Sequence, residues 1–306
     1  MATRKPPWLK VKLPSGERLA RYNRVKTRAR ELKLHTVCEE AQCPNIGECW
    51  GGGTATFMVM GDICTRGCRF CAVNTKRIGP PLDVDEPANV ARGIAEMELD
   101  YVVLTSVNRD DLDDQGADHF AACINAIKLA SPKTMVEVLT PDFTGRLELV
   151  DRVLDAGPTV YAHNIETVER LQRPVRDPRA NYQQSMDVLA HVKTHTPTNF
   201  SKSSIQVGLG EKPAEVLQTM QDLRDVGVDF LTLGQYLQPS GKHLKVTEFV
   251  TPETFDWYAE QGRAMGFRYV ASGPLVRSSY KAGEFFIREF IEKQQDPTAW
   301  TKPLAR

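Results

Sequence analysis

Residues 54–71 of the chain read TATFMVMGDICTRGCRFC, and this stretch joins an apolar run to three closely spaced cysteines. Residues 54–60 are rich in β-branched and apolar side chains, which predicts a buried strand. Cys64, Cys68 and Cys71 follow with C-x3-C-x2-C spacing. Three thiolates on one short loop can ligate three irons of a cubane cluster and leave the fourth iron open to another ligand. The alternatives are loose thiols or a structural zinc site, although zinc sites of that kind normally have four protein ligands.

Apolar runs of the same kind recur along the chain, and each is followed by a helical pattern. Further strands are expected over residues 101–107, 134–140, 159–165, 204–209, 230–237 and 269–276. Helices are expected between them, over residues 86–99, 115–130, 145–156, 182–194, 213–226 and 252–265. This alternation predicts βα units around a parallel sheet. The α/β fold is then a full or partial (β/α) barrel or, as the alternative, a doubly wound open sheet, and in both the sites form at the carboxyl ends of the strands.

Three parts of the chain differ in character. Residues 1–53 are expected to form an N-terminal extension, residues 54–276 the barrel, and residues 277–306 a C-terminal extension. Lys and Arg are concentrated in residues 1–33. This basic arm is either a contact for an acidic partner protein or a solvated tail.

The overall composition is that of an ordinary globular protein. Of 306 residues, 41% are hydrophobic and 25% are charged, which excludes a disordered or fibrous chain. The 39 basic and 39 acidic residues cancel, so no global charge pattern indicates nucleic-acid binding. No apolar run reaches the roughly 18–20 residues of a membrane span, and no secretory signal is recognisable. We therefore expect a cytoplasmic protein with neither a nucleic-acid nor a membrane partner.

Six of the seven cysteines lie within one segment of the chain, between residues 38 and 71. A disulfide framework is typical of small secreted domains, so metal binding is the better interpretation. Cys38, Cys43 and Cys49 have C-x4-C-x5-C spacing, which indicates a second cluster that lacks a fourth cysteine nearby. Cys123 lies inside a helical run and is expected to be a small buried core residue.

The C-x3-C-x2-C motif is similar to that of the radical S-adenosylmethionine (SAM) enzymes. Both cysteine motifs together with residues 277–280, RSSY, resemble the lipoyl synthase family over nearly the whole chain. The segments that carry this resemblance are VCEEAQCPNIGECW (37–50), GDICTRGCRFC (61–71), TSVNRDDLDDQGA (105–117), VEVLTPDF (136–143), HNIETV (163–168), GLGE (208–211), LTLGQYLQPS (231–240) and RSSY.

The resemblance implies two 4Fe-4S clusters with different roles. The first, on Cys64, Cys68 and Cys71, is expected to bind SAM and to generate a 5′-deoxyadenosyl radical. The second, auxiliary cluster is expected to be bound by the three cysteines of the second motif, Cys38, Cys43 and Cys49, together with a serine of RSSY. That serine is Ser278 or Ser279, and we favour Ser279 as a catalytic and metal-binding residue.

The reaction implied by the resemblance inserts two sulfur atoms into an unactivated chain. They enter at C6 and C8 of an octanoyl group on a carrier-protein lysine, with two SAM molecules cleaved and the auxiliary cluster as the sulfur donor. The implied partners are octanoylated lipoyl carrier proteins or domains, which could contact the basic arm, and reduced ferredoxin or flavodoxin as the electron donor.

Polar residues on the strands or near their ends are candidates for contacts with SAM or substrate. For each of them a role in a turn or in packing is the alternative. Arg66 and Arg69, which flank cluster cysteines, could raise the cluster potential, meet a partner or simply be exposed. The candidates for cofactor contacts are Asn108, Arg109, Glu137, His163, Asn164, Lys202, Gln235 and Tyr236.

Two other functions compete with this interpretation. One is a different radical SAM sulfur-inserting enzyme, similar to biotin synthase, which the N-terminal cysteine motif and RSSY disfavour. The other is an interaction protein with structural zinc, which the repeated βα pattern with polar strand ends disfavours.

Overall fold

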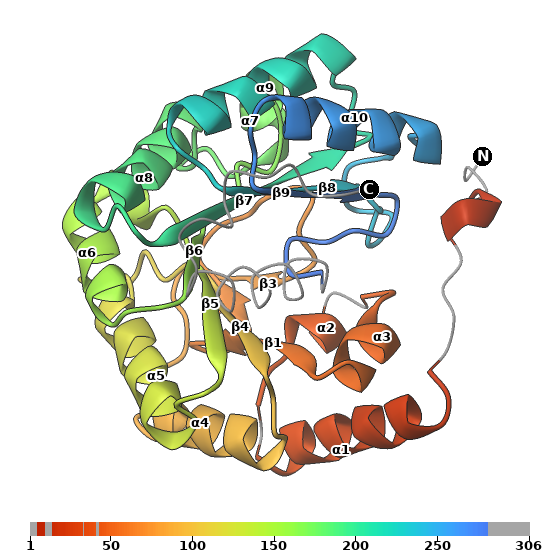
Figure 1. The fold of residues 1–306 in the computed structure, drawn as a ribbon. Coiled ribbons are helices and arrows are strands. Elements are labelled where there is room, and N and C mark those ends of the chain that lie inside the picture. Colours follow the sequence, from red (N-terminus) through yellow and green to blue (C-terminus); the bar gives the residue numbers. More distant parts are fainter. Residues whose placement is uncertain (1–4, 10–13, 33, 41–42, 281–306) are drawn as a thin grey trace, which may run out of the picture.

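The computed structural model describes residues 5–9, 14–32, 34–40 and 43–280. Its main feature is a parallel sheet whose seven strands follow one another in chain order (Figure 1). The strands of this sheet are β1 (Thr54–Val59), β4 (Tyr101–Ser106), β5 (Met135–Leu139), β6 (Val160–Ala162), β7 (Phe200–Val207), β8 (Phe230–Gln235) and β9 (Tyr269–Gly273). The sheet does not close, because β1 and β9 are its two edges. The expected partial barrel is therefore confirmed, and the doubly wound alternative is wrong because the strand order never reverses.

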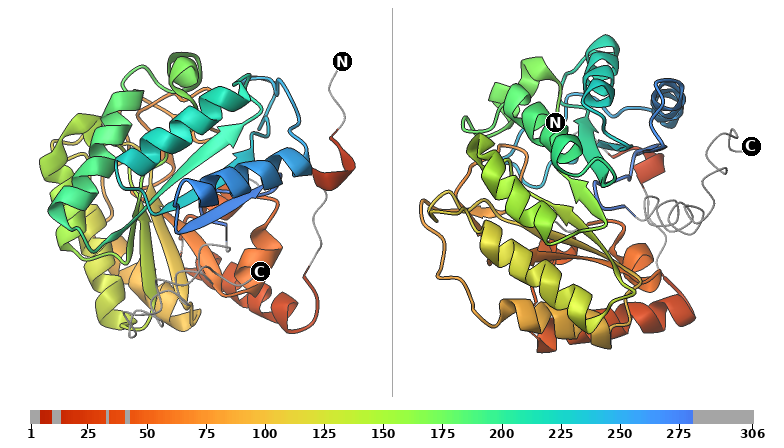
Figure 2. Two further views of the ribbon diagram at one scale, coloured as in Figure 1. Left: turned by 45° about the horizontal axis from the view of Figure 1, so that its top comes forward. Right: turned by 60° about the vertical axis from the view of Figure 1, so that its left-hand side comes forward.

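Helices cover the outer face of the curved sheet (Figure 2). The longer ones in this layer are α4 (Glu86–Glu96), α5 (Ala117–Ala130), α6 (Leu147–Asp155), α8 (Tyr182–His195), α9 (Pro213–Asp225) and α10 (Pro252–Ala264). Shorter elements are η1 (Pro7–Leu9), η2 (Phe143–Gly145), η3 (Glu169–Leu171) and α7 (Gln172–Val175), with a two-stranded pair of β2 (Ile63–Cys64) and β3 (Asn74–Thr75). The positions of the six longer helices match the expected ones to within three residues, with the largest difference at the end of α4.

Local sequence explains why these helices form and end where they do. In α6 the apolar side chains at Leu149, Val150, Val153 and Leu154 share one buried face, as 3.6-residue periodicity requires. Thr251 caps α10 by accepting a hydrogen bond from the Thr254 amide. Three helices are followed by glycines with positive φ angles, 68° at Gly157, 84° at Gly227 and 88° at Gly266, as is common at helix C-termini.

Three strands differ from the sequence prediction by three residues or more, and one of them, β9, ends at Gly273 instead of residue 276. β7 begins at Phe200, four residues before the expected start, because polar Ser201, Lys202 and Ser203 are buried in the strand. β6 ends at Ala162, so His163 and Asn164 lie just beyond it. Because the first residues of β7 are polar, the hydrophobic pattern of the sequence does not predict that they belong to the strand.

The N-terminal extension adds a helix, α1 (Glu17–Glu31), which lies beside α4 in the outer layer (Figure 1). Three of its cations pair with acidic groups at the end of α4 and in the loop that follows. Arg21 lies 3.6 Å from Asp100, Arg24 lies 3.3 Å from Glu98, and Arg28 lies 3.6 Å from Glu96. This part of the basic arm is therefore not a solvated tail.

The two short helices α2 (Val37–Glu40) and α3 (Ile46–Gly51) pack on β1, in the gap between β1 and the last strands (Figure 1). Trp50 of α3 is fully buried, and its ring lies 5.4 Å from that of Tyr22. Asn45 donates a hydrogen bond to the carbonyl oxygen of Leu275, beyond β9, at 2.6 Å. The N-terminal extension thereby connects the two edges of the open barrel.

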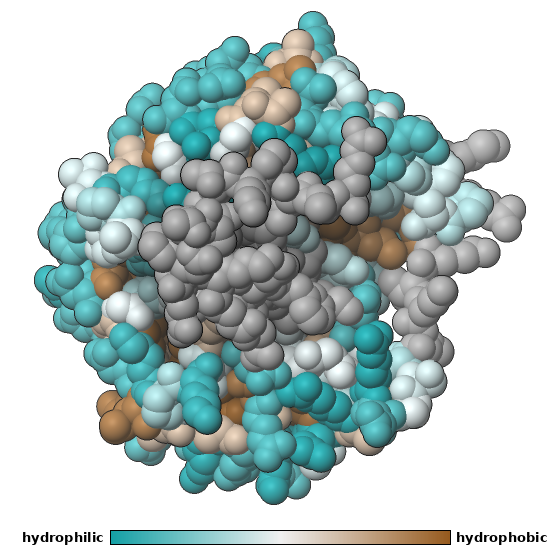
Figure 3. All heavy atoms as spheres, viewed as in Figure 1, coloured by the Kyte–Doolittle hydropathy of each residue, from teal (hydrophilic) through white to brown (hydrophobic). Residues whose placement is uncertain are grey.

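The surface that Figure 3 shows is mostly hydrophilic around the described part of the barrel. Exposed large apolar side chains such as Trp8, Ile78, Val84 and Leu129 are scattered along the chain. Among the described residues, no helix has both the length and the apolar character needed to cross a membrane.

Gly234 of β8 makes room for the chain segment that follows β9. A Cβ atom at this position would clash with the carbonyl oxygen of Val276. Gly234→Ala should therefore lower the thermal midpoint of unfolding by roughly 2–6 °C, since overpacking costs about 1–3 kcal/mol.

Gly241→Ala is the matched control, because no atom lies within 4 Å of an added Cβ there. Its midpoint should stay close to that of the wild type. Equal midpoints for the two variants in differential scanning calorimetry would show that the close approach at Gly234 does not constrain the fold.

Candidate functional site

The first cysteine motif lies on a loop at the carboxyl end of β1. The parallel pairing of β2 with β3 closes this loop, with Cys64 opposite Thr75. The Cys64 sulfur accepts hydrogen bonds from the amides of Arg66 and Asn108, both at 3.4 Å. Asn108 follows β4, so the loop is attached to the neighbouring strand as well as to its own.

The three thiols of this loop lie close enough to influence one another. Burial, with a smaller contribution from the neighbouring thiols, raises the pKa of Cys68 to about 11 and that of Cys71 to about 12. Buried thiolates need a nearby positive charge, and iron supplies one. The donor set and its burial therefore fit a cluster ligated through Cys64, Cys68 and Cys71.

A clamp formed by the residues after α7 holds the same loop. The Asp177 carboxylate accepts a hydrogen bond from the Gly67 amide at 2.8 Å, and the Asp177 amide donates to the Cys68 sulfur at 3.3 Å. Arg179 pairs with this carboxylate and holds its pKa well below the usual range. This clamp was not predicted from the sequence, although the charged run 176–179, RDPR, is the signal that could have indicated it.

Arg66 connects the loop to two further strand ends through buried ion pairs. Its guanidinium makes two 2.8 Å bonds to Asp110, after β4, and one of 2.7 Å to Asp142, after β5. Burial alone would raise the pKa of Asp142, but Arg66 outweighs it and the pKa is lowered. Arg66 is therefore not a partner contact, whereas Arg69 is exposed and donates to the Pro174 carbonyl.

Asn108 is the cofactor candidate that the structure brings to the cluster loop. Its side-chain amide nitrogen lies 3.8 Å from the Cys64 sulfur. Its side-chain oxygen is buried and has no hydrogen-bond partner among the described residues. A buried acceptor left free beside the cysteines favours a ligand at this position.

Three other candidates for cofactor contact form hydrogen bonds with other groups of the protein. Arg109 is buried and forms two 2.9 Å bonds to Asp111. The Gln235 amide bonds to the backbone of Val207, Tyr236, Glu248 and Val250, and the Tyr236 hydroxyl donates to the Leu244 carbonyl at 2.8 Å. These contacts fix the loops at the barrel rim and fit the packing alternative.

Glu137 and Lys202 meet each other inside the barrel. Their charged atoms lie 2.8 and 2.9 Å apart, and the Tyr101 hydroxyl donates to Glu137 at 2.5 Å. Lys202, a candidate for cofactor contact, thus contacts the carboxylate of Glu137. Both side chains are almost fully buried, so the pair neutralises two charges in the barrel interior.

His163 and Asn164 are also engaged by neighbouring residues. The His163 ring lies 2.9 Å from both the Thr140 carbonyl and the Ser185 hydroxyl. Burial and then the charge of Arg176 lower its pKa to about 4, so the ring is neutral. Asn164 donates to Glu166 at 3.0 Å. His163 therefore connects the residue after β6 to Thr140, which follows β5, and to Ser185 of α8.

The second cysteine motif and the C-terminal RSSY line one small cavity. The side chains that surround it are those of Cys38, Cys43, Asn45, Ile46, Cys49, Thr54, Thr56, Arg277, Ser279 and Tyr280. Ser278 is not among them. The structure thus brings the three thiols and the Ser279 hydroxyl together from the two ends of the chain, beside the hydroxyls of Thr54, Thr56 and Tyr280.

Burial sets the charge properties of this cavity. Burial raises the pKa of Cys38 to about 11, and it also raises the pKa of Cys43. Burial lowers the pKa of Arg277, whose charge in turn acts on Cys43. The sequence analysis quoted Arg277 within RSSY but assigned it no role. Its guanidinium also donates to the Gln235 carbonyl at 3.1 Å and so fixes the segment after β9.

Comparisons with known proteins give two matching family models and relatives of high sequence identity. The chain matches the model of the radical SAM superfamily over residues 58–223 and that of the N-terminal domain of lipoyl synthase over residues 1–43. It is 58% identical to the mitochondrial lipoyl synthase of Bos taurus over 297 residues, which are 95% of this chain and 79% of that protein. The mitochondrial lipoyl synthase of Homo sapiens is 57% identical with the same coverage.

Solved structures resemble the chain in fold. The hydrogenase maturase HydG of Carboxydothermus hydrogenoformans has a TM-score of 0.54 at 14% identity, covering 78% of this chain and 66% of HydG. Methylornithine synthase has a TM-score of 0.54 at 12% identity, covering 82% of both chains. These likenesses support the open barrel as the shared fold.

The names of the relatives correct one expectation about cellular location. The lipoyl synthases of Bos taurus, Danio rerio and Homo sapiens are all named mitochondrial. The cytoplasmic location expected from the sequence is therefore contradicted by these relatives. Charge and apolarity near the N-terminus were insufficient to decide this question.

The Asp177 clamp makes a testable prediction about the cluster loop. Asp177→Asn removes a charge that supports hydrogen bonds to the Gly67 amide and to Arg179, each worth about 1.5–3 kcal/mol. Iron loss to a chelator should become about tenfold faster or more. The measurement is made with Cys38, Cys43 and Cys49 replaced by Ala, so that only the first motif binds iron.

Asp187→Asn on the exposed side of α8 is the matched control, with iron loss expected at the rate of its parent protein. Iron loss from Asp177→Asn that is no faster than from this control would contradict the clamp.

Proposed function

The chain belongs to the lipoyl synthases, a family of the radical SAM superfamily, and from this membership we propose which of its residues carry each part of the reaction. It is thus a sulfurtransferase that converts a protein-bound octanoyl group to a lipoyl group by sulfur insertion. Family membership also decides against a biotin-synthase-like enzyme and against a structural zinc protein.

Cys64, Cys68 and Cys71 bind a 4Fe-4S cluster with one iron left for SAM. The convergence of the three thiols and their burial support this assignment. With SAM bound, the cluster supplies a radical that removes hydrogen from an unactivated C–H bond. Asn108 contacts the bound SAM through its free buried oxygen. The Asp177 clamp and the Arg66 ion pairs keep the thiols and Asn108 in fixed relative positions.

Cys38, Cys43, Cys49 and Ser279 bind the auxiliary 4Fe-4S cluster that donates sulfur. The single observation that carries this proposal is their common cavity, which includes Ser279 and not Ser278. A serine oxygen is a harder ligand than a thiolate and a weaker match for iron. It therefore provides the corner at which the cluster can be opened when sulfur leaves.

The partners are an octanoylated carrier and a protein that delivers electrons, such as reduced ferredoxin or flavodoxin. A carrier with an acidic surface could reach the exposed cations of the basic arm, such as Arg18. Arg21, Arg24 and Arg28 already pair with acids of this chain. Their contribution to docking therefore requires exchange of ion pairs and should be smaller than the charge of the arm suggests.

The origin of the inserted sulfur tests this function. Protein reconstituted with ³⁴S-sulfide and given an octanoylated carrier should transfer two ³⁴S atoms in a single turnover, as mass spectrometry of the carrier reads directly. The Cys38→Ala, Cys43→Ala, Cys49→Ala variant should cleave SAM to 5′-deoxyadenosine without forming a thiolated product. Unlabelled sulfur in the product, or product formation by the variant, would refute the auxiliary cluster as the donor.

The choice between the two serines has its own test. Ser279→Ala removes one of the four donors, so iron at the auxiliary site should be lost faster and lipoyl formation should fall more than about tenfold. Ser278→Ala is the matched control and should behave as the wild type. The opposite pattern in iron retention and product yield would assign the ligand to Ser278.

A further inference from the structure

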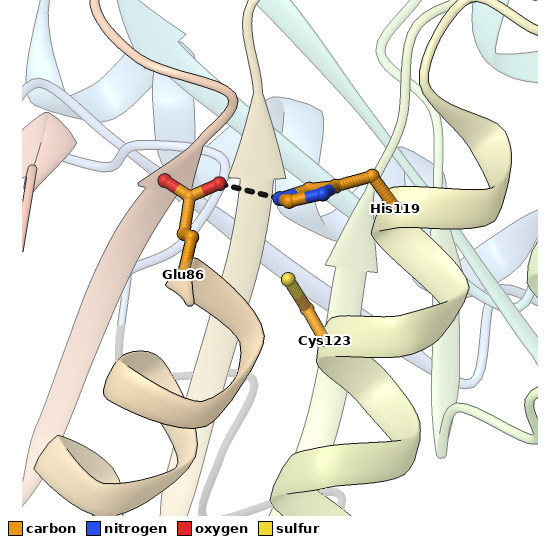
Figure 4. Close-up of side chains that lie close together, drawn as sticks. All are labelled: Glu86, His119 and Cys123. Atoms are coloured by element: carbon orange, nitrogen blue, oxygen red, sulfur yellow. Dashed lines mark hydrogen bonds and ion pairs between the residues drawn. The ribbon is translucent and has the colours of Figure 1, made fainter. Parts of the chain in front are cut away.

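A third group of metal-binding side chains lies outside both cysteine motifs. Glu86, His119 and Cys123 each offer a ligand atom, and these atoms all lie within 4.8 Å of one another (Figure 4). Glu86 begins α4, whereas His119 and Cys123 are one turn apart on α5. Residues four apart share a helix face, so both side chains point from α5 toward Glu86.

Hydrogen bonds already orient this group. Glu86 Oε2 lies 2.6 Å from His119 Nε2 and accepts a bond from the Met60 amide at 2.8 Å. The side chains of His119 and Glu86 are only 9% and 14% exposed, and Cys123 is fully buried. Cys123 is buried as the sequence predicts, but it faces an imidazole and a carboxylate rather than apolar groups alone.

We propose that Glu86, His119 and Cys123 bind a divalent cation of the zinc type. Zinc accepts carboxylate oxygen, imidazole nitrogen and thiolate sulfur in one tetrahedral site. A carboxylate and a thiolate together cancel the two positive charges of the ion, so the loaded site is neutral, which suits its burial. On binding, the thiol releases its proton to solvent and the neutral imidazole contributes a lone pair.

A cavity that Glu86 lines offers a route for the fourth ligand, although His119 and Cys123 do not line it. Glu86 lines a cavity of about 220 Å³ that Met58, Met60 and Pro80 also line. A cavity of this size admits water, and water at the fourth position completes the tetrahedron. Because Glu86 also binds the Met60 amide, the ion would connect α4 and α5 to the residue that precedes the cluster loop.

A second group of possible ligands provides the comparison. Asp151, His191 and His195 also place their ligand atoms within 4.8 Å of one another. Their side chains are 32%, 20% and 30% exposed, and the group contains no thiol. In addition, Nε2 of His195 lies 2.9 Å from Oδ1 of Asp155 and is engaged by that carboxylate. A zinc ion should therefore prefer the group that contains Cys123.

The test uses the full chain with its iron–sulfur clusters reconstituted anaerobically, equilibrated with Zn²⁺ alone and freed of excess metal. We expect a zinc ion with a single sulfur neighbour at about 2.3 Å and nitrogen or oxygen neighbours at about 2.0–2.1 Å in zinc K-edge absorption spectra. Cys123→Ala keeps a small apolar side chain and should weaken zinc binding more than about 100-fold and remove the sulfur neighbour. His119→Gln is a second variant for the case in which Cys123→Ala fails to fold.

The matched control replaces His191 and His195 by Asn and should leave the sulfur-containing zinc site unchanged. Three outcomes overturn the proposal. If Cys123→Ala or His119→Gln left the zinc affinity unchanged, these side chains would have a packing role only. If the control variant lost zinc, the ion would bind at the more exposed group of Asp151, His191 and His195. Three sulfur neighbours would show that zinc had replaced iron at a cysteine motif.

Discussion

An open barrel leaves two unpaired strand edges, and the structure of this chain depends on how the gap between them is filled. The edges are β1 and β9. Unpaired edges expose backbone donors and acceptors and need a cover. The cover comes from both ends of the chain, because α2 and α3 pack on β1 while the segment after β9 crosses to meet them.

The auxiliary donor set lies at this junction. Cys38, Cys43 and Cys49 belong to the N-terminal cover, and Ser279 belongs to the segment that follows β9. A cluster bound by all four would connect the two edges of the sheet directly. Removal of sulfur from such a cluster would then loosen the contact between the chain ends, so the proposed sulfur source is also a structural connection.

Regular features of the fold could be predicted because they repeat in the sequence. The βα alternation located all seven strands of the main sheet, since apolar runs and helix-ending glycines mark each unit. The start of β7 was missed because its buried residues include Lys202, whose charge is neutralised by Glu137 two strands away in the sheet. Such pairing between distant segments leaves no periodic signal.

The candidate site likewise contains residues that the sequence could predict and residues that it could not. Cysteine spacing predicted both thiol groups, because ligands on one short loop are local in sequence. Asp177 could not be placed beside Gly67 from spacing, since 110 residues separate them and only the fold brings them together. Gln235 ends β8 as predicted and His163 lies one residue beyond β6, but their hydrogen bonds within the protein were visible only in three dimensions.

The central claim is that this chain binds two cubane clusters through separate cysteine motifs. Iron and sulfide content after anaerobic reconstitution tests it most directly. About eight irons per chain in the wild type, falling to about four when Cys38, Cys43 and Cys49 are replaced by Ala, is the predicted result. About four irons in both proteins would contradict the account, because the N-terminal cysteines would then hold no cluster.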